Sequence, residues 1–103
     1  MLTTDLAFDR QGSGPPLVLI HGVGHHRQTW QPVAHELGWD HDVIAADSPG
    51  FGKSPPLGVG APHTTAAYAD ASAGWFQAMG LQRPHVAGNS RGGAIALELA
   101  RRG

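Results

Sequence analysis

The sequence of 103 residues contains no cysteine. Disulfides and thiolate metal sites are therefore excluded, and this composition is typical of a reducing compartment, so we expect a cytoplasmic protein. Charged residues make up only 15% of the chain, and the formal net charge is −1 at pH 7. Without a basic surplus there is no electrostatic reason to expect nucleic acid or an anionic membrane as a partner.

Long hydrophobic segments are also missing. The N-terminal stretch "MLTTDLAFDR" has neither a basic region nor an apolar run of the kind found in secretion signals, and no apolar run approaches the length needed to cross a membrane. The seven histidines fall in no metal-binding spacing, so scattered surface histidines are the better interpretation and neither a metal nor another cofactor is expected.

What the sequence does contain is an alternation of short apolar runs and helical patterns. The run "LVLIHG" at 17–22 is continuous, as expected of a strand buried on both faces. Strands alternating with helices predict parallel βαβ units in one domain. The predicted strands cover 6–10, 17–22, the "DVIAA" run at 42–46 and the residues from 85 that precede Gly88, with a turn at 11–16; the predicted helices cover 29–38, 64–80 and the segment after Ser90.

Capping residues mark the ends of these helices. Thr29 is a candidate N-cap and Gly38 a candidate stop for the first helix. The second has Thr64 or Thr65 as N-cap and Gly80 as its end, and Gly103 suits the end of the third. Helical spacing predicts that one face of the second helix is formed by Tyr68, Ala71, Trp75 and Met79.

The stretch "HVAGNSRGGAIALELA" places one serine between a predicted strand and a predicted helix. Gly88, Ser90 and Gly92 form the pattern G-x-S-x-G, the spacing of a nucleophile elbow. In such a turn the glycines allow neighbouring backbone to crowd a strained serine, whose hydroxyl then stands clear of the sheet. The alternative is a glycine-rich turn in which Ser90 only caps the helix.

Two glycine-rich loops raise the alternative of a nucleotide-binding βαβ domain. Gly52, Lys53 and Ser54 resemble the end of a phosphate-binding loop, but Asp47 stands where its first glycine belongs. Gly22 and Gly24 follow a strand as in a dinucleotide site, but the third glycine position holds Arg27. Both loops miss a required glycine, so nucleotide binding is the less favoured interpretation.

Three motifs, "LVLIHGVG", "VIAADSPGFGKS" and "HVAGNSRGG", follow one another along the chain. In this order they resemble the N-terminal part of an α/β-hydrolase-fold protein, a group that includes esterases, lipases, epoxide hydrolases and haloalkane dehalogenases. The resemblance implies a truncated α/β-hydrolase fold: a mostly parallel α/β sheet with flanking helices, whose strands lie in the order second, fourth, third, fifth of the family. Residues 1–103 are then a partial domain that ends after the elbow helix.

The resemblance also implies roles for particular residues. Ser90 is the nucleophile of a serine hydrolase acting on an ester-like bond of a small molecule, and the backbone N–H groups of Val23 and Arg91 form the oxyanion hole. Asp47 is structural rather than the catalytic acid. Asn89 and Arg91 stand where the family more often has histidine or glutamine and a small or apolar residue, so the substrate subclass stays open.

The acid and base of a catalytic triad do not follow Ser90 in this sequence. The fold's triad runs Ser, then Asp or Glu, then His, whereas Glu98 is the only acidic residue after Ser90 and no histidine follows it. Glu98 lies about 12 Å along the same helix, out of hydrogen-bond reach. His21 is interpreted as a packed structural residue rather than a base.

We therefore expect the isolated chain to be nearly inert as a hydrolase. The alternative of a non-catalytic binding module with the same fold stays open. Because the elbow strand at 85–89 is central in the family's sheet, we expect its open edge to self-associate or to receive the missing C-terminal half.

Overall fold

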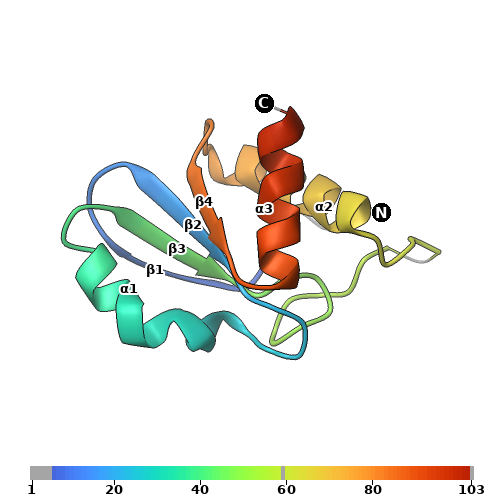
Figure 1. Ribbon diagram of the computed structural model, residues 1–103, viewed down its shortest axis with the longest axis horizontal. Helices are drawn as coiled ribbons and strands as arrows, with labels where there is room; N and C mark the ends of the chain where they lie inside the picture. The colour runs from blue at the N-terminus through green and yellow to red at the C-terminus, as the bar shows by residue number, and fades with distance from the viewer. Residues whose placement is uncertain (1–5, 59, 103) are drawn as a thin grey trace.

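The structure is a computed structural model that describes residues 6–58 and 60–102. Its described strands form one sheet in the order β1-β3-β2-β4 (Figure 1). Strand β2 is parallel to both of its neighbours, and β1 alone runs antiparallel, beside β3. In the family's numbering this is the order second, fourth, third, fifth, so the prediction of a mostly parallel sheet in that order is confirmed. The strands are β1 (Phe8–Gly12), β2 (Pro16–Ile20), β3 (Asp42–Ala46) and β4 (His85–Gly88).

The first strand differs from its predicted bounds. It was expected at 6–10 but covers Phe8–Gly12, because pairing with β3 extends from Phe8 opposite Ala46 to Gly12 opposite Asp42. The backbone of Gln11 and Gly12, expected in a turn, is therefore held in the ladder. Glycine is needed at 12, since its φ is +89° and a Cβ there would lie 2.3 Å from the His41 carbonyl oxygen.

Helices cover both faces of the sheet (Figure 1). Helix α1 (Gln31–Leu37), preceded by the 3₁₀ turn η1 (Arg27–Trp30), packs through Ala34 on Leu19, Val43 and Ala45. Helices α2 (Thr65–Met79) and α3 (Arg91–Arg102) cover Val18, Ile20 and Ile44 on the opposite face. Alternate side chains of β2 thus enter two cores, which confirms that this strand is buried on both faces.

The predicted caps of α2 are confirmed. The Thr64 hydroxyl accepts a hydrogen bond from the Ala67 N–H at 3.1 Å, and Gly80 ends the helix with φ +72°. The predicted buried face is also present, with Tyr68, Ala71 and Trp75 buried and Met79 packed against them.

The predicted start of the first helix is wrong. Thr29 lies inside the 3₁₀ turn and caps nothing, and the α-helix begins at Gln31. Pro32 explains the difference, since proline lacks an N–H and fits an α-helix only in its first turn. Gly38 ends this helix as predicted, while the predicted cap Gly103 lies outside the described residues. No helix in the described part of the chain has the length and apolar character needed to cross a membrane.

Candidate active site

Ser90 lies at the junction of β4 and α3 with a strained backbone. Strand β4 ends at Gly88, α3 begins at Arg91, and Ser90 between them has φ +58°. Left-handed backbone at a residue other than glycine costs about 1 kcal/mol or more and persists only where the surroundings enforce it. The Ser90 hydroxyl forms no hydrogen bond with the described residues, and the residue is exposed.

The two glycines of the motif enforce this turn by close approach. A Cβ on Gly88 would lie 2.1 Å from the Gly92 carbonyl oxygen, and a Cβ on Gly92 would lie 2.1 Å from the Ile20 carbonyl oxygen. Both distances are far below van der Waals contact, and the atoms met are backbone atoms that cannot rotate away. The pattern therefore holds the first turn of α3 against the ends of β4 and β2.

The loop after β2 lies directly beside the serine. A Cβ on Gly22 would lie 3.3 Å from the Ser90 Cβ and 3.2 Å from the Asn89 carbonyl oxygen. The Asn89 N–H donates to the Ile20 carbonyl at 3.2 Å, which extends the β2–β4 ladder to the elbow. The predicted neighbourhood of the His-Gly loop and the elbow is thus present in the structure.

The two predicted oxyanion donors line the same small cavity. Val23 and Arg91 share it with His21, Gly22, Ser48, Phe51, Tyr68 and Ile95. Neither the Val23 N–H nor the Arg91 N–H donates a hydrogen bond within the described residues. Val23 is exposed, whereas Arg91 is half-buried. Two unsatisfied N–H groups near a serine are the arrangement that stabilises a developing oxyanion.

His21 is bonded at both ring nitrogens. Its Nε2 accepts from the Ser48 N–H at 2.9 Å, and its Nδ1 lies 2.7 Å from the Gly22 carbonyl oxygen. Because the Ser48 N–H is a donor, Nε2 must be the acceptor, and Nδ1 carries the proton given to Gly22. The ring is buried, packs edge-on against Phe51, and joins the loops that follow β2 and β3. It has no lone pair left to act as a base for Ser90.

Asp47 is the buried anchor of the loop that follows β3. Its carboxylate accepts from the Arg27 N–H at 2.6 Å, from the Arg27 guanidinium and from the Lys53 N–H at 2.9 Å. Burial alone raises the pKa of Asp47, but the hydrogen bonds from Lys53 and Arg27 and the Arg27 charge outweigh it and lower that pKa. A Cβ on Gly52 would lie 2.2 Å from Asp47 Oδ2. Because Asp47 is fully buried and already accepts three hydrogen bonds, its carboxylate is not accessible to a ribose or a catalytic histidine.

The Glu98 carboxylate is likewise engaged, in ion pairs with two arginines. Its carboxylate pairs with Arg101 at 2.7 Å and Arg102 at 2.8 Å at the C-terminal end of α3. Hydrogen bonds from these two arginines lower the pKa of Glu98 to about 2. No histidine nitrogen in the described residues bonds to the Ser90 hydroxyl, and the same residues contain no cluster of three or more metal-ligating side chains.

Three features of the site were not found from the sequence. Arg27 was noted only as a missing glycine, whereas it is the ion-pair partner of Asp47. The Ser54 hydroxyl donates to the Asp47 carbonyl at 2.6 Å and accepts from the Ala7 N–H at 2.8 Å. Tyr68 was expected only in the core, yet it also lines the cavity. Each depends on contacts between distant segments, for which the sequence carried no local signal.

Comparison with known proteins agrees with this geometry. The sequence profile described as alpha/beta hydrolase fold matches residues 15–103. A protein of Mycobacterium tuberculosis is 36% identical over 94 residues, which are 91% of this chain and 27% of that protein. A 2-hydroxy-6-oxo-6-phenylhexa-2,4-dienoate hydrolase of Comamonas testosteroni is 35% identical over 97 residues, covering 90% of this chain and 34% of the relative.

Solved structures give the same result. A thermophilic esterase from Thermogutta terrifontis superposes with a TM-score of 0.84 at 35% identity, over 94% of this chain and 35% of the esterase chain. The chain therefore belongs to the α/β-hydrolase-fold family. It spans about a third or less of the length of these relatives.

Proposed function

We propose that this chain carries the nucleophile and the oxyanion hole of a serine hydrolase acting on an ester-like bond of a small molecule. One observation carries the proposal: Ser90 stands at φ +58° on the elbow, beside a cavity lined by Val23 and Arg91, and neither of their N–H groups donates a hydrogen bond within the described residues. The names of the relatives support it, since one is an esterase described with malate bound and another hydrolyses a dienoate. We further propose a cytoplasmic location, as the cysteine-free composition suggests.

The chemistry assigned to these residues is acyl transfer. Ser90 Oγ forms a bond to the substrate carbonyl carbon, and the carbonyl π electrons move to the oxygen, which the N–H groups of Val23 and Arg91 hold as an oxyanion. The hydroxyl proton goes to a base and then to the leaving alcohol when the carbon–oxygen bond of the ester breaks. Water then hydrolyses the acyl-enzyme by the same route. His21 and Glu98 are occupied, so we assign base and acid to polypeptide outside these 103 residues.

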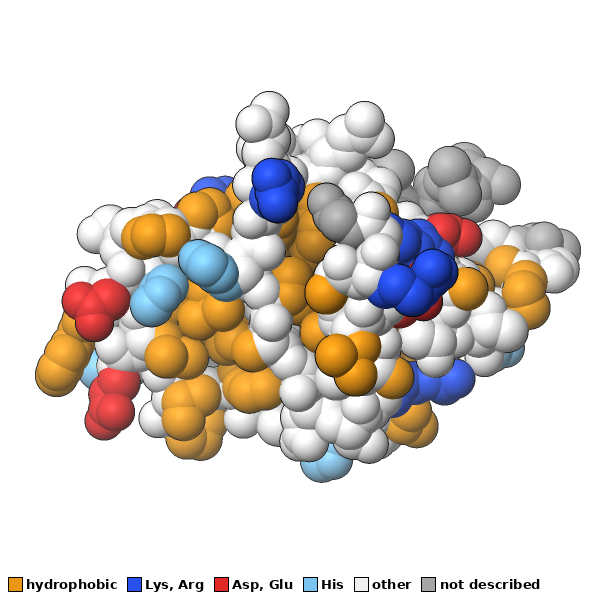
Figure 2. Space-filling view, turned by 45° about the horizontal axis from the view of Figure 1, so that its top comes forward, with side chains coloured by type: hydrophobic (Ala, Val, Ile, Leu, Met, Phe, Trp, Pro, Cys, Tyr) orange, Lys and Arg blue, Asp and Glu red, His pale blue; other side chains and the backbone are white. Residues whose placement is uncertain are grey.

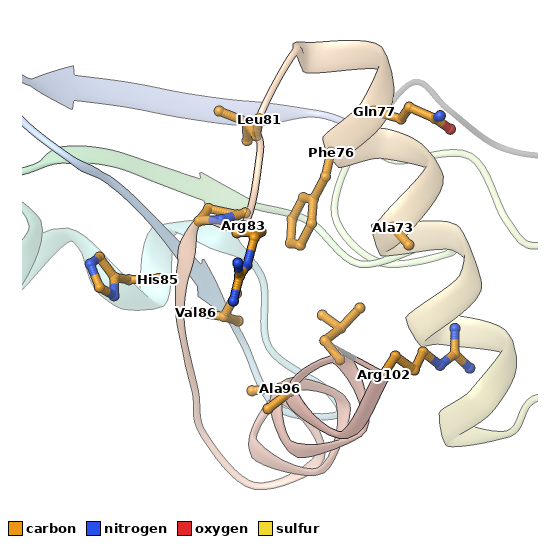
Figure 3. A pocket seen from close by; sticks show the side chains of 12 residues that line it. Ala73, Phe76, Gln77, Leu81, Arg83, His85, Val86, Ala96 and Arg102 are labelled. Carbon is orange, nitrogen blue, oxygen red and sulfur yellow. The ribbon is translucent and has the colours of Figure 1, made fainter.

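The outer edge of β4 is where we propose that this polypeptide docks. Among the described strands β4 pairs only with β2, which leaves its other edge open. Beside that edge an open groove of about 720 Å³ lies between α2, α3 and β4, with Phe76, Leu81, Val86 and Leu99 among its lining side chains (Figure 3). Hydrophobic side chains are visible across this side of the molecule in Figure 2.

The proposed occupant of this groove is the rest of the hydrolase fold. The chain spans about a third of its relatives, and α3 ends at Arg102, directly beside the groove. An unpaired strand edge flanked by apolar side chains favours addition of a further strand. Pairing of two copies through this edge is the competing result, which the mass of the isolated chain in solution would reveal.

Covalent labelling tests the proposed nucleophile. The full polypeptide that carries these residues is treated with a fluorophosphonate, and the labelled residue is identified by mass spectrometry. We expect the label on Ser90, and its loss together with ester turnover in Ser90→Ala. Ser13→Ala is the matched control, since Ser13 is an exposed serine in the turn between β1 and β2. Specific binding of a small molecule without labelling or turnover would instead favour the non-catalytic binding module.

A further inference from the structure

The side chain of Arg91 lies on the wall of the Ser90 crevice. Arg91 is the first residue of α3, directly after the serine, and lines the cavity together with Tyr68. Its guanidinium carbon stands 5.1 Å above the centre of the Tyr68 ring, and its Nη2 donates to the His63 carbonyl at 3.2 Å. The backbone of Arg91 thus serves the oxyanion, while its side chain points along the wall built by the start of α2.

The charge of this guanidinium is not neutralised. Arg10, Arg27, Arg101 and Arg102 each form an ion pair with a carboxylate. Arg83 and Arg91 form none with any described residue; Arg83 is exposed, whereas Arg91 is half-buried and lines the cavity beside Ser90. A guanidinium without a carboxylate partner keeps its charge available to an anionic ligand.

The contacts of Arg91 orient it without using up its donors. The His63 carbonyl takes one N–H, and the Tyr68 face takes none, so most of the five N–H groups stay available. Tyr68 is itself buried and stacks on the His63 ring. The aromatic face on which the guanidinium lies is therefore held in place by packing. A planar guanidinium held on an aromatic face is preorganised for the planar, two-oxygen geometry of a carboxylate.

We propose that the Arg91 side chain binds a carboxylate of the substrate, so that the preferred substrates are monoesters of dicarboxylic acids. This rests on the proposed function for the turnover of Ser90, but the carboxylate site itself does not. One carboxyl group, as the ester, lies against Ser90 and the oxyanion donors, and the free carboxylate pairs with the guanidinium. The length of the carbon chain between the ester and the free carboxylate sets which diacid fits best.

Paired substrates test the specificity. The full polypeptide is assayed with 4-nitrophenyl acetate and with the 4-nitrophenyl monoesters of succinate and glutarate. Loss of a charged hydrogen bond corresponds to about a 10- to 100-fold change. We expect Arg91→Gln to lower the preference for the better monoester, measured as the ratio of its kcat/KM to that of the acetate, by that factor. Arg91→Lys keeps the charge but lacks the paired N–H donors of the guanidinium, so we expect it to lose less of the preference than Arg91→Gln.

Arg101→Gln is the matched control for charge. It removes the same charge from the same helix about 15 Å away along the axis, where Arg101 is exposed and touches only Glu98. This variant should leave the preference for the monoester unchanged. An Arg91→Gln variant whose preference is unchanged, or which loses both substrates equally, would overturn the proposal.

A binding measurement separates this inference from the proposed function. Succinate is titrated by calorimetry into the Ser90→Ala protein, with and without Arg91→Gln, and inorganic phosphate is titrated in parallel. Succinate binding that depends on Arg91 supports the carboxylate site even if no ester is turned over, in which case only the proposed function fails. Succinate binding that is absent, or unaffected by Arg91→Gln, contradicts the site. Tighter binding of phosphate through Arg91 would contradict the carboxylate assignment.

Discussion

The two edges of β4 differ in whether their backbone groups are paired with another strand of the sheet. The inner edge pairs with β2 from His85 to Gly88, and the elbow beyond it is fixed by backbone contacts with Ile20 and Gly92. The outer edge pairs with no described strand and borders a wide apolar groove. The elbow side of β4 is therefore closed by contacts within the described residues, while the side where we propose that the acid and base dock is open.

The largest effect expected from this contrast is on turnover. A complete triad contributes about 10⁶ in kcat, whereas binding and an oxyanion hole alone leave about 10³–10⁴ over water. We expect the isolated 103-residue chain to hydrolyse an activated ester only at that residual level, and to associate through the β4 edge. Ester turnover and light scattering of the purified chain, compared with Ser90→Ala, give the measurement. Strong Ser90-dependent turnover by a clean monomer would contradict both expectations.

The next largest effect is on stability, at the elbow that adjoins the paired edge of β4. Gly92→Ala would place a Cβ 2.1 Å from the Ile20 carbonyl oxygen, so we expect a loss of about 3 kcal/mol in the free energy of unfolding, measured by urea denaturation. Gly93→Ala is the matched control, because its Cβ would meet the Gly88 carbonyl oxygen at an ordinary 3.4 Å. If the two variants proved equally stable, the steric account of the motif would be wrong.

Asp47 gives an intermediate effect with a defined pH dependence. Its pKa is lower in the folded chain than in the unfolded chain, so its stabilisation is present above the unfolded value of about 4 and is lost as pH falls through the folded value. We expect Asp47→Asn to cost about 3 kcal/mol at pH 7, by leaving Arg27 without its buried partner, and to flatten the acid limb of the stability curve. Asp40→Asn, at an exposed aspartate without an ion pair among the described residues, is the control and should cost less than about 0.5 kcal/mol at pH 7.

The smallest effect is expected at Glu98, the only carboxylate that follows Ser90 in the chain. Because it pairs with Arg101 and Arg102 at the far end of α3, Glu98→Gln should leave Ser90-dependent turnover of the full polypeptide within about twofold. A loss of several orders of magnitude would show that Glu98 acts as the catalytic acid after all.

Local patterns in the sequence were sufficient for most of the fold. The continuous run of β2, the cap Thr64, the end at Gly80 and the motif around Ser90 each depend on neighbouring residues, and the structure has them as predicted, except that β2 spans Pro16–Ile20 rather than 17–22. The errors at Thr29 and in the bounds of β1 arose where Pro32 or pairing with β3 outweighed local preference. The catalytic roles of Ser90, Val23 and Arg91 stay predictions that the labelling and substrate assays address.

The sequence by itself determined that a serine stands in a tight strand-to-helix turn and that, within these 103 residues, Glu98 is the only acid and no histidine comes after it. Only the tertiary structure decided which side chains already have hydrogen-bond or ion-pair partners. The Ser48 N–H, from a distant loop, occupies Nε2 of His21, and Arg27 and Lys53 donate to the buried Asp47. Arg91 lies on the Tyr68 ring without a counter-ion among the described residues. A side chain's type sets its chemistry, but whether its donors and lone pairs are free depends on partners that folding brings together.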